Sequence, residues 1–214
     1  MLASASVDAA NSPWGDVSWI DLTHDFSPET IFWTTDTQGF VLEEDFSGMT
    51  DKGYFYSSNS YRAAEHGGTH IDAPIHFAKY SQALHEIPLE RLTGPAAVID
   101  VRQQSNADRD YQVTVEDFTN WEELNGPLAP GVIVLLRTGF DQYWPDAERY
   151  LGTADRGPDA IPKLHFPGLH PSEAKWMVEN RSIDALGIDT ASIDFGQSEL
   201  YDWSRLRKPG HLKS

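Results

Sequence analysis

Short aliphatic runs that alternate with polar segments are the strongest indication of how this sequence folds. Four runs have the β-branched and aliphatic character of buried strands, each closed by polar or turn residues: VSWIDLTH (17–24), AAVIDV (96–101), GVIVLLRTG (131–139) and IDALGID (183–189). We therefore expect four strands at these positions.

Two segments between these runs have helical patterns. TVEDFTNWEEL (114–124) begins with Thr114 and has Asp117 three residues later, which resembles a capping box. HPSEAKWMVENR (170–181) offers Pro171 and Ser172 at a helix start, before an apolar face of Ala174, Trp176 and Met177. The order of strand, helix and strand predicts a mixed α/β fold.

Composition indicates one globular domain. The chain has 214 residues, of which 40% are hydrophobic and 12% aromatic, so a sizeable core can form. Its formal net charge is −17. Phosphate backbones and anionic lipid surfaces would repel so acidic a chain, so we expect neither nucleic acid nor membrane as a partner.

The sequence contains no cysteine, which excludes disulfides, zinc fingers and a thiol nucleophile, so any metal must have nitrogen and oxygen ligands. The N-terminus has no apolar signal segment, and no apolar run approaches the about 20 residues that a bilayer requires. We therefore expect a soluble, cytoplasmic protein.

The segment HGGTHIDAPIHF (66–77) holds three of the eight histidines. Because Gly67, Gly68 and Pro74 disfavour a helix, we expect a glycine turn followed by an extended piece. Side chains alternate in an extended segment, so His70 and Asp72 share a face, with His76 further along it, while the turn can bring His66 to the same point.

Neutral imidazoles and a carboxylate suit Mn²⁺ or Zn²⁺, so we expect His66, His70 and Asp72 to bind one ion. His76 is then well placed for proton transfer, because histidine titrates near neutrality. A divalent ion activates water for attack on a carbonyl carbon, which predicts a hydrolase. The alternative for each histidine taken alone is an ordinary structural or surface role.

This signature resembles that of the metal-dependent cyclase family, which includes bacterial kynurenine formamidases and isatin hydrolases. Supporting similarity covers about residues 17–202 and runs through IDLTHDFSPETIFW (20–33), IPLERLTGPAAVIDV (87–101), GVIVLLRTGFDQYW (131–144) and HFPGLHPSEAKWMVENRSIDALGIDTASIDFGQS (165–198). HFPGL and IDTASIDFGQS look more like the isatin-hydrolase branch. The resemblance implies a swivelling β/β/α domain, a mixed sheet with flanking helices, assembled as a homodimer or higher homo-oligomer.

By position, the resemblance makes His66, His70 and Asp72 metal ligands and His76 the catalytic acid and base. It places Trp33, Phe77 and His165 at the substrate pocket. His24 and His85 are expected to be structural or exposed.

The resemblance divides the chain into a disordered lead-in (1–16), a hydrolase domain (17–202) and an atypical basic tail (203–214). After GQS the family continues through a further His and Glu that complete a second metal site in some members, whereas here the basic tail follows. His211 has no assignable role in this tail. We therefore expect one ion more readily than two.

Three functions remain open at this point. The first is hydrolysis of a small cyclic amide such as isatin, and the second is hydrolysis of N-formylkynurenine as an arylformamidase. The third is a non-catalytic relative that keeps the signature and acts as a binding subunit.

Overall fold

The computed structural model describes residues 18–198 of the chain. Its central sheet has three parallel strands in the order β3–β5–β7. These strands are β3 (Ala96–Asp100), β5 (Ile133–Arg137) and β7 (Ala185–Ile188), so three of the four predicted strands are confirmed, each slightly shorter than its aliphatic run.

The predicted strand over 17–24 is wrong, because residues 18–24 are irregular. Trp19 and Leu22 have relative exposures of 81% and 80%, so neither is the buried strand residue that the run suggested. The Asp21 carboxylate accepts hydrogen bonds from the backbone N–H and the hydroxyl of Thr23 at 2.9 and 2.7 Å. Such local bonds favour a turn over a strand.

Both predicted helices are confirmed, as α2 (Val115–Asn125) and α4 (Pro171–Asn180). The predicted capping box is formed at the start of α2, where Asp117 accepts the backbone N–H of Thr114 at 2.8 Å. Phe118 and Met177 are buried, whereas Ala174 of the predicted apolar face of α4 is exposed.

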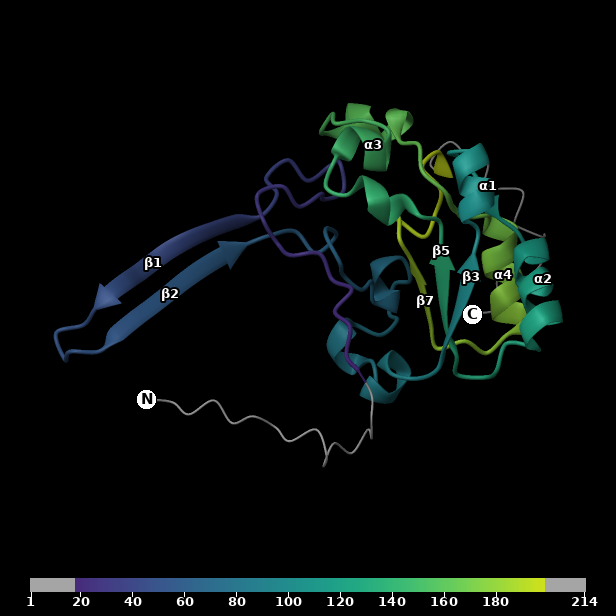
Figure 1. The fold of residues 1–214 in the computed structure, drawn as a ribbon, viewed down its shortest axis with the longest axis horizontal. Coiled ribbons are helices and arrows are strands. Elements are labelled where there is room, and N and C mark those ends of the chain that lie inside the picture. The colour runs from purple at the N-terminus through teal and green to yellow at the C-terminus, as the bar shows by residue number, and fades with distance from the viewer. Residues whose placement is uncertain (1–17, 199–214) are drawn as a thin grey trace.

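Helices cover one face of the central sheet. α2 and α4 lie side by side over it, with α1 (Arg102–Ala107) at its upper end in Figure 1. Ala97, Ile99, Val134 and Leu136 alternate with more exposed residues along β3 and β5 and form the core with α2 and α4. The predicted α/β class is therefore confirmed.

The other elements are short or lie apart from the central sheet. A second cluster of buried residues, which includes Phe140, Leu164 and Phe166, lies around α3. The remaining bounds are β4 (Gln112–Val113), α3 (Ala147–Leu151), β6 (Gly168–Leu169), and the 3-10 helices η2 (Pro74–His76), η3 (Leu84–Glu86), η4 (Leu89–Leu92), η5 (Phe140–Tyr143) and η6 (Pro158–Lys163).

A long antiparallel hairpin, which none of the aliphatic runs predicted, projects from the body of the protein (Figure 1). It is formed by β1 (Val41–Met49) and β2 (Phe55–Arg62), with a register shift between Glu44 and Phe46. We call residues 41–62 the arm. The parallel and antiparallel pairings of the fold thus belong to separate sheets.

Both predicted domain boundaries lie outside the residues that the structure describes. The predicted lead-in (1–16) and basic tail (203–214), including His211, lie outside the described residues. None of the helices in residues 18–198 is long and apolar enough to cross a membrane.

Candidate metal centre

The loop that carries the predicted site (residues 66–77) follows the arm and is fixed to an earlier segment by backbone hydrogen bonds. The N–H of Trp33 donates to the carbonyl of His66, and the N–H of Gly68 donates to the carbonyl of Ile31, both at 3.0 Å. These bonds flank a bridge between Phe32 and Gly67. The start of the loop is therefore attached to a buried part of the protein.

The two glycines are required for this close approach. A Cβ at Gly67 would lie 2.1 Å from the ring of Phe32, and Gly68 has a φ of +58°. No larger residue fits the first position, and the second uses the left-handed region that glycine adopts readily. The predicted glycine turn is thus explained by packing against Phe32.

The extended piece is shorter than expected. Ala73 is extended, with φ −76° and ψ 152°, but Pro74, Ile75 and His76 form the 3-10 helix η2. The prediction that His76 continues the extended segment is wrong, because Pro74 starts a helical turn. This turn folds His76 back toward His66.

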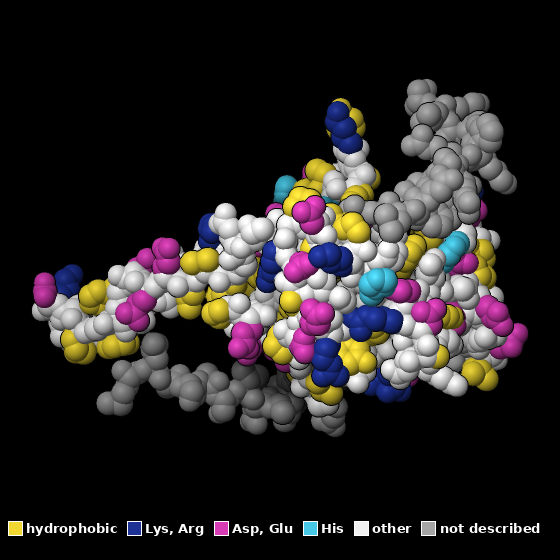
Figure 2. Space-filling view, turned by 90° about the horizontal axis from the view of Figure 1, so that it is seen from above, with side chains coloured by type: hydrophobic (Ala, Val, Ile, Leu, Met, Phe, Trp, Pro, Cys, Tyr) yellow, Lys and Arg dark blue, Asp and Glu magenta, His cyan; other side chains and the backbone are white. Residues whose placement is uncertain are grey.

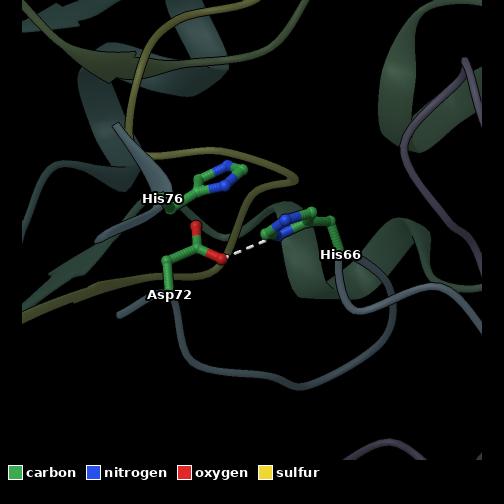
Figure 3. A group of neighbouring side chains, drawn as sticks. All are labelled: His66, Asp72 and His76. Carbon is green, nitrogen blue, oxygen red and sulfur yellow. Dashed lines mark hydrogen bonds and ion pairs between the residues drawn. The ribbon is translucent and has the colours of Figure 1, made fainter. Parts of the chain in front are cut away.

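Three predicted residues meet at one point, as Figure 3 shows. Nδ1 of His66 and Oδ1 of Asp72 form a hydrogen bond of 2.8 Å. The rings of His66 and His76 lie 3.9 Å apart between centroids. Ligand atoms of His66, Asp72 and His76 all lie within 4.8 Å of one another.

His70 faces the same carboxylate from another side. Its Nδ1 lies 3.0 Å from the carbonyl oxygen of Gly68, and its Nε2 lies 3.5 Å from Oδ1 of Asp72. A carbonyl only accepts, so Nδ1 carries a proton and a neutral His70 presents the lone pair of Nε2 to Asp72. Two acceptors that face each other favour a proton or a cation between them.

The donor set fits a divalent cation. A backbone carbonyl that fixes the tautomer of a histidine is the usual support for a metal-ligating imidazole. Imidazole nitrogens and carboxylate oxygens also suit Zn²⁺ and Mn²⁺. Two sets of three ligands could hold the ion. His66 and Asp72 belong to both sets, and the third ligand is either the predicted His70 or His76.

Two of the predicted substrate residues lie beside this centre. Trp33 adjoins His66 through its backbone hydrogen bond and is partly buried. Phe77 contacts His76, with 4.1 Å between ring centroids, and its side chain is 86% exposed. The structure therefore brings Trp33 and Phe77 to the loop.

His165 has other neighbours. Its Nδ1 lies 2.8 Å from a carboxylate oxygen of Asp110, and its Nε2 lies 3.5 Å from the Gln197 amide nitrogen. Neither partner belongs to residues 66–77. A role for His165 at the substrate pocket remains a prediction.

His24 lies nearer to the loop than the sequence suggested. Its backbone N–H donates to the hydroxyl of Thr69 at 2.9 Å, directly beside His70. Its ring stacks on Trp144, with 4.5 Å between centroids and an angle of 14°. His24 and Thr69 thus join an irregular N-terminal segment to the candidate centre, a contact over 45 residues that no local motif reveals.

The centre is open to solvent. The side chains of His66, His70 and Asp72 are 33%, 26% and 48% exposed. An α/β chain with two or three imidazoles and a carboxylate at such an accessible point has the features of a metal-dependent enzyme.

The family comparison agrees with this class. Residues 20–195 match the family described as "Putative cyclase", so the chain belongs to the cyclase family. The matched range includes the arm, the loop with its three histidines, and the central sheet.

Two curated relatives carry the names of amide hydrolases. The isatin hydrolase of Roseibium aggregatum is 28% identical over 200 residues, which cover 86% of this chain and 71% of that protein. The kynurenine formamidase of Salinibacter ruber is 31% identical over 135 residues, which cover 60% of this chain and 57% of that protein.

A solved structure has a similar fold. Isatin hydrolase A from Ralstonia solanacearum superposes with a TM-score of 0.73 at 30% identity, over 86% of this chain and 70% of that one. The chain therefore spans between about half and three quarters of the length of these relatives.

Proposed function

We propose that this chain is a divalent-metal-dependent hydrolase that opens a small cyclic amide of the isatin type. The observation that carries the proposal is the pair of acceptors at the loop, Nε2 of His70 and Oδ1 of Asp72, 3.5 Å apart beside His66. The names of the relatives support amide hydrolysis, and two isatin hydrolases are among them.

His66, His70 and Asp72 would hold the ion, and Mn²⁺ and Zn²⁺ both suit them. When bound, a divalent ion polarises a carbonyl and activates water at neutral pH. In the reaction, the oxygen of water bonds to the amide carbon, the C–N bond breaks, and the nitrogen takes up a proton. A cyclic amide then yields one molecule with a carboxylate and an amine.

His76 moves the proton in this scheme. Its ring lies 3.9 Å from that of His66, at the end of η2, and its side chain is exposed to an incoming substrate. A neutral imidazole can take a proton from water and pass it to the leaving nitrogen. Trp33, bonded to His66 through its backbone, and Phe77, in contact with His76, offer flat apolar surfaces for an aromatic substrate.

The arylformamidase reaction is the second candidate, since kynurenine formamidase relatives reach 31% identity. It uses the same attack of water on an open-chain formamide. Isatin and N-formylkynurenine should be assayed side by side with Mn²⁺ and with Zn²⁺, and the ratio of kcat/KM decides between them. We expect isatin to be preferred.

The variant His76→Ala tests the mechanism, with His85→Ala as its matched control on the neighbouring helix η3. We expect His76→Ala to lose about 10²–10⁴-fold in kcat, the range for a general acid or base, and to keep its bound metal. His85→Ala should hydrolyse isatin as the wild type does. Wild-type turnover by metal-loaded His76→Ala would exclude the role given to His76. If the wild type binds metal stoichiometrically but hydrolyses neither substrate, the chain is a non-catalytic relative.

A further inference from the structure

An exposed imidazole does not by itself make a metal ligand, because many histidines lie at protein surfaces. Figure 2 shows histidine side chains at separate places on the surface of this protein. A metal-binding histidine also needs a hydrogen-bond partner that fixes its tautomer and the direction of its ring. For His70 this partner is the carbonyl of Gly68, which lies 3.0 Å from Nδ1. The affinity of the centre for an ion therefore depends on what holds Gly68 in place.

Residues 24–31, which we call the clasp, hold this part of the loop at two points. The N–H of His24 donates to the hydroxyl of Thr69 at 2.9 Å, and the carbonyl of Ile31 accepts the N–H of Gly68 at 3.0 Å. The two bonded residues of the loop directly precede the predicted ligand in the chain. Both ends of the clasp are thus attached next to that ligand.

A buried threonine closes the clasp. Thr30 is 3% exposed, and its hydroxyl donates to the carbonyl of Asp25 at 3.3 Å and accepts the N–H of Ser27 at 2.8 Å. The N–H of Thr30 donates in turn to the carbonyl of Ser27 at 3.0 Å. A short polar side chain that bonds nearby backbone groups favours a turn over regular structure. This turn sets the spacing between the two ends of the clasp.

The clasp also packs against the loop through apolar atoms. A Cβ at Gly68 would lie 3.2 Å from Cγ2 of Thr30 and 3.5 Å from the ring of Phe26. The ring of Phe26 lies 6.2 Å from that of buried Phe32, between centroids. These neighbours restrict the position of Gly68, so residues distant in the sequence set the direction of its carbonyl oxygen.

An aromatic stack anchors the clasp to the body of the protein. The ring of His24 lies 4.5 Å from that of Trp144, at an angle of 14°. Trp144 packs edge-on against buried Tyr150, whose hydroxyl donates to the carbonyl of Asp189 at 3.4 Å, directly after β7. A series of contacts therefore leads from the central sheet to the loop.

We propose that His24 and Thr69 are positioning residues of the metal centre, which act through the Gly68 carbonyl to direct Nε2 of His70 at the ion. This role rests on the proposed function, because it concerns the affinity for the proposed ion. A neutral imidazole without a fixed partner can carry its proton on either nitrogen. Loss of the clasp would place the proton on Nε2 in part of the molecules and so block the ligand atom.

The imidazole nitrogens of His24 take no part in this role. The stack uses the face of the ring, and the bond to Thr69 uses the backbone N–H. Another flat side chain at position 24 should therefore serve equally well, which separates a positioning residue from a ligand or a proton carrier.

The affinity for Mn²⁺, measured by calorimetric titration of chelator-treated protein, tests the proposal without any substrate. Thr69→Val keeps the shape of the side chain but cannot accept the N–H of His24, and we expect it to weaken Mn²⁺ binding at least about tenfold. Thr69→Ser keeps the hydroxyl and should bind nearly as the wild type does. Thr119→Val is the control, because the hydroxyl of Thr119 donates to the Glu116 carbonyl on α2. Equal affinities of Thr69→Val and the wild type would overturn the proposal.

Variants of the stack test the anchor. His24→Ala keeps the backbone N–H but loses the ring, and we expect it to bind Mn²⁺ about threefold more weakly, in line with the value of one stacked ring pair. Trp144→Leu removes the opposite ring and should give a similar loss, whereas His24→Phe should keep the wild-type affinity. An equal loss in His24→Phe and His24→Ala would show that an imidazole nitrogen is required and would contradict a positioning role.

The tautomer of His70 provides a readout that a change in stability alone would not move. In ¹⁵N spectra of the metal-free wild type at about pH 8, where an ordinary histidine is neutral, the ring nitrogens of His70 should show a proton on Nδ1 only. In Thr69→Val the shifts of the two nitrogens should approach each other as both tautomers become populated. His70→Gln identifies the signals by their loss. Unchanged shifts in Thr69→Val would also overturn the proposal.

The affinity series separates this proposal from the proposed function. If the wild type hydrolyses no amide but binds Mn²⁺ tenfold more tightly than Thr69→Val, the hydrolase fails and the positioning role holds. If the wild type hydrolyses the amide but Thr69→Val binds Mn²⁺ equally well, the positioning role fails and the hydrolase holds.

Discussion

The part of the fold before residue 90 and the part after it have opposite relations to solvent. After residue 90, β3, β5 and β7 bury one face under α2 and α4, and Phe118 and Val134 are fully covered. Before residue 90, the arm and the loop with His66, His70 and Asp72 remain largely exposed. The difference teaches that the C-terminal part supplies the packed core, whereas the N-terminal part keeps its apolar side chains and the imidazoles of the loop accessible to solvent.

The largest expected effect concerns activity alone. Asp72→Asn removes the carboxylate shared by His66 and His70, so we expect kcat/KM for isatin to fall by about 10³-fold, since a divalent ion contributes several kcal/mol to transition-state stabilisation. The thermal midpoint should stay close to that of the wild type because the loop lies outside the core. Asp159→Asn, at an exposed site on η6, is the control and should change neither quantity.

The next effect concerns stability alone. Phe118→Ala opens a cavity between α2 and the sheet, and we expect it to lower the free energy of unfolding by about 3–5 kcal/mol. Leu124→Ala on the same helix replaces a side chain that is 87% exposed. This variant should change the free energy of unfolding by about 0.5 kcal/mol or less. Urea denaturation measures both. Similar values for the two variants would contradict the division between core and surface.

A smaller effect comes from the ion pair that joins α2 to the end of α4. Arg181 donates to both carboxylate oxygens of Glu122, at 2.8 and 2.6 Å, and stacks over Trp176. This guanidinium lowers the pKa of Glu122. We expect Glu122→Gln to cost about 1–2 kcal/mol at pH 7, between the values for exposed and buried pairs.

The pH dependence of this variant has a definite sign. A lowered folded-state pKa contributes stability above the unfolded value of about 4.5, and this contribution is lost as the pH falls through the folded-state pKa. The difference between Glu122→Gln and the wild type should therefore shrink from pH 7 to pH 3. A difference that grows at acid pH would contradict the assignment.

The smallest effect is expected at Asp194, which forms a parallel bridge with Leu169 of β6. Burial raises the pKa of this carboxyl, so its ionised form costs stability once the pH exceeds the unfolded value of about 3.8. Asp194→Asn should raise the melting temperature slightly at pH 7 and have little effect at pH 4. A lower melting temperature at pH 7 would show that the carboxylate has a stabilising partner.

The sequence predicted the C-terminal part of the fold well because local patterns determine it. The aliphatic runs around Ile99, Val134 and Leu186 became the three parallel strands, and Thr114 with Asp117 marked the start of α2. Buried residues of this kind repeat at the periods of strands and helices, so one sequence reveals them.

The N-terminal part was harder to predict because contacts distant in sequence determine it. The apolar residues around Ile20 suggested a strand, but the bonds of Asp21 favour a turn. Hydrophobic and polar residues alternate only weakly in the arm, because serines such as Ser57 and Ser58 occupy both faces of β2. The expectation that the four residues of the loop gather was sound in outline, yet the turn at Pro74 that brings His76 to His66 was missed.

The rate of isatin hydrolysis as metal is removed and returned tests the central claim most directly. Chelator-treated protein should be inactive, and activity should return saturably at one equivalent of Mn²⁺ per chain in the wild type but not in Asp72→Asn. A hydrolysis rate unchanged by removal of the metal, or restored equally in Asp72→Asn, would contradict the assignment of this loop as the metal centre.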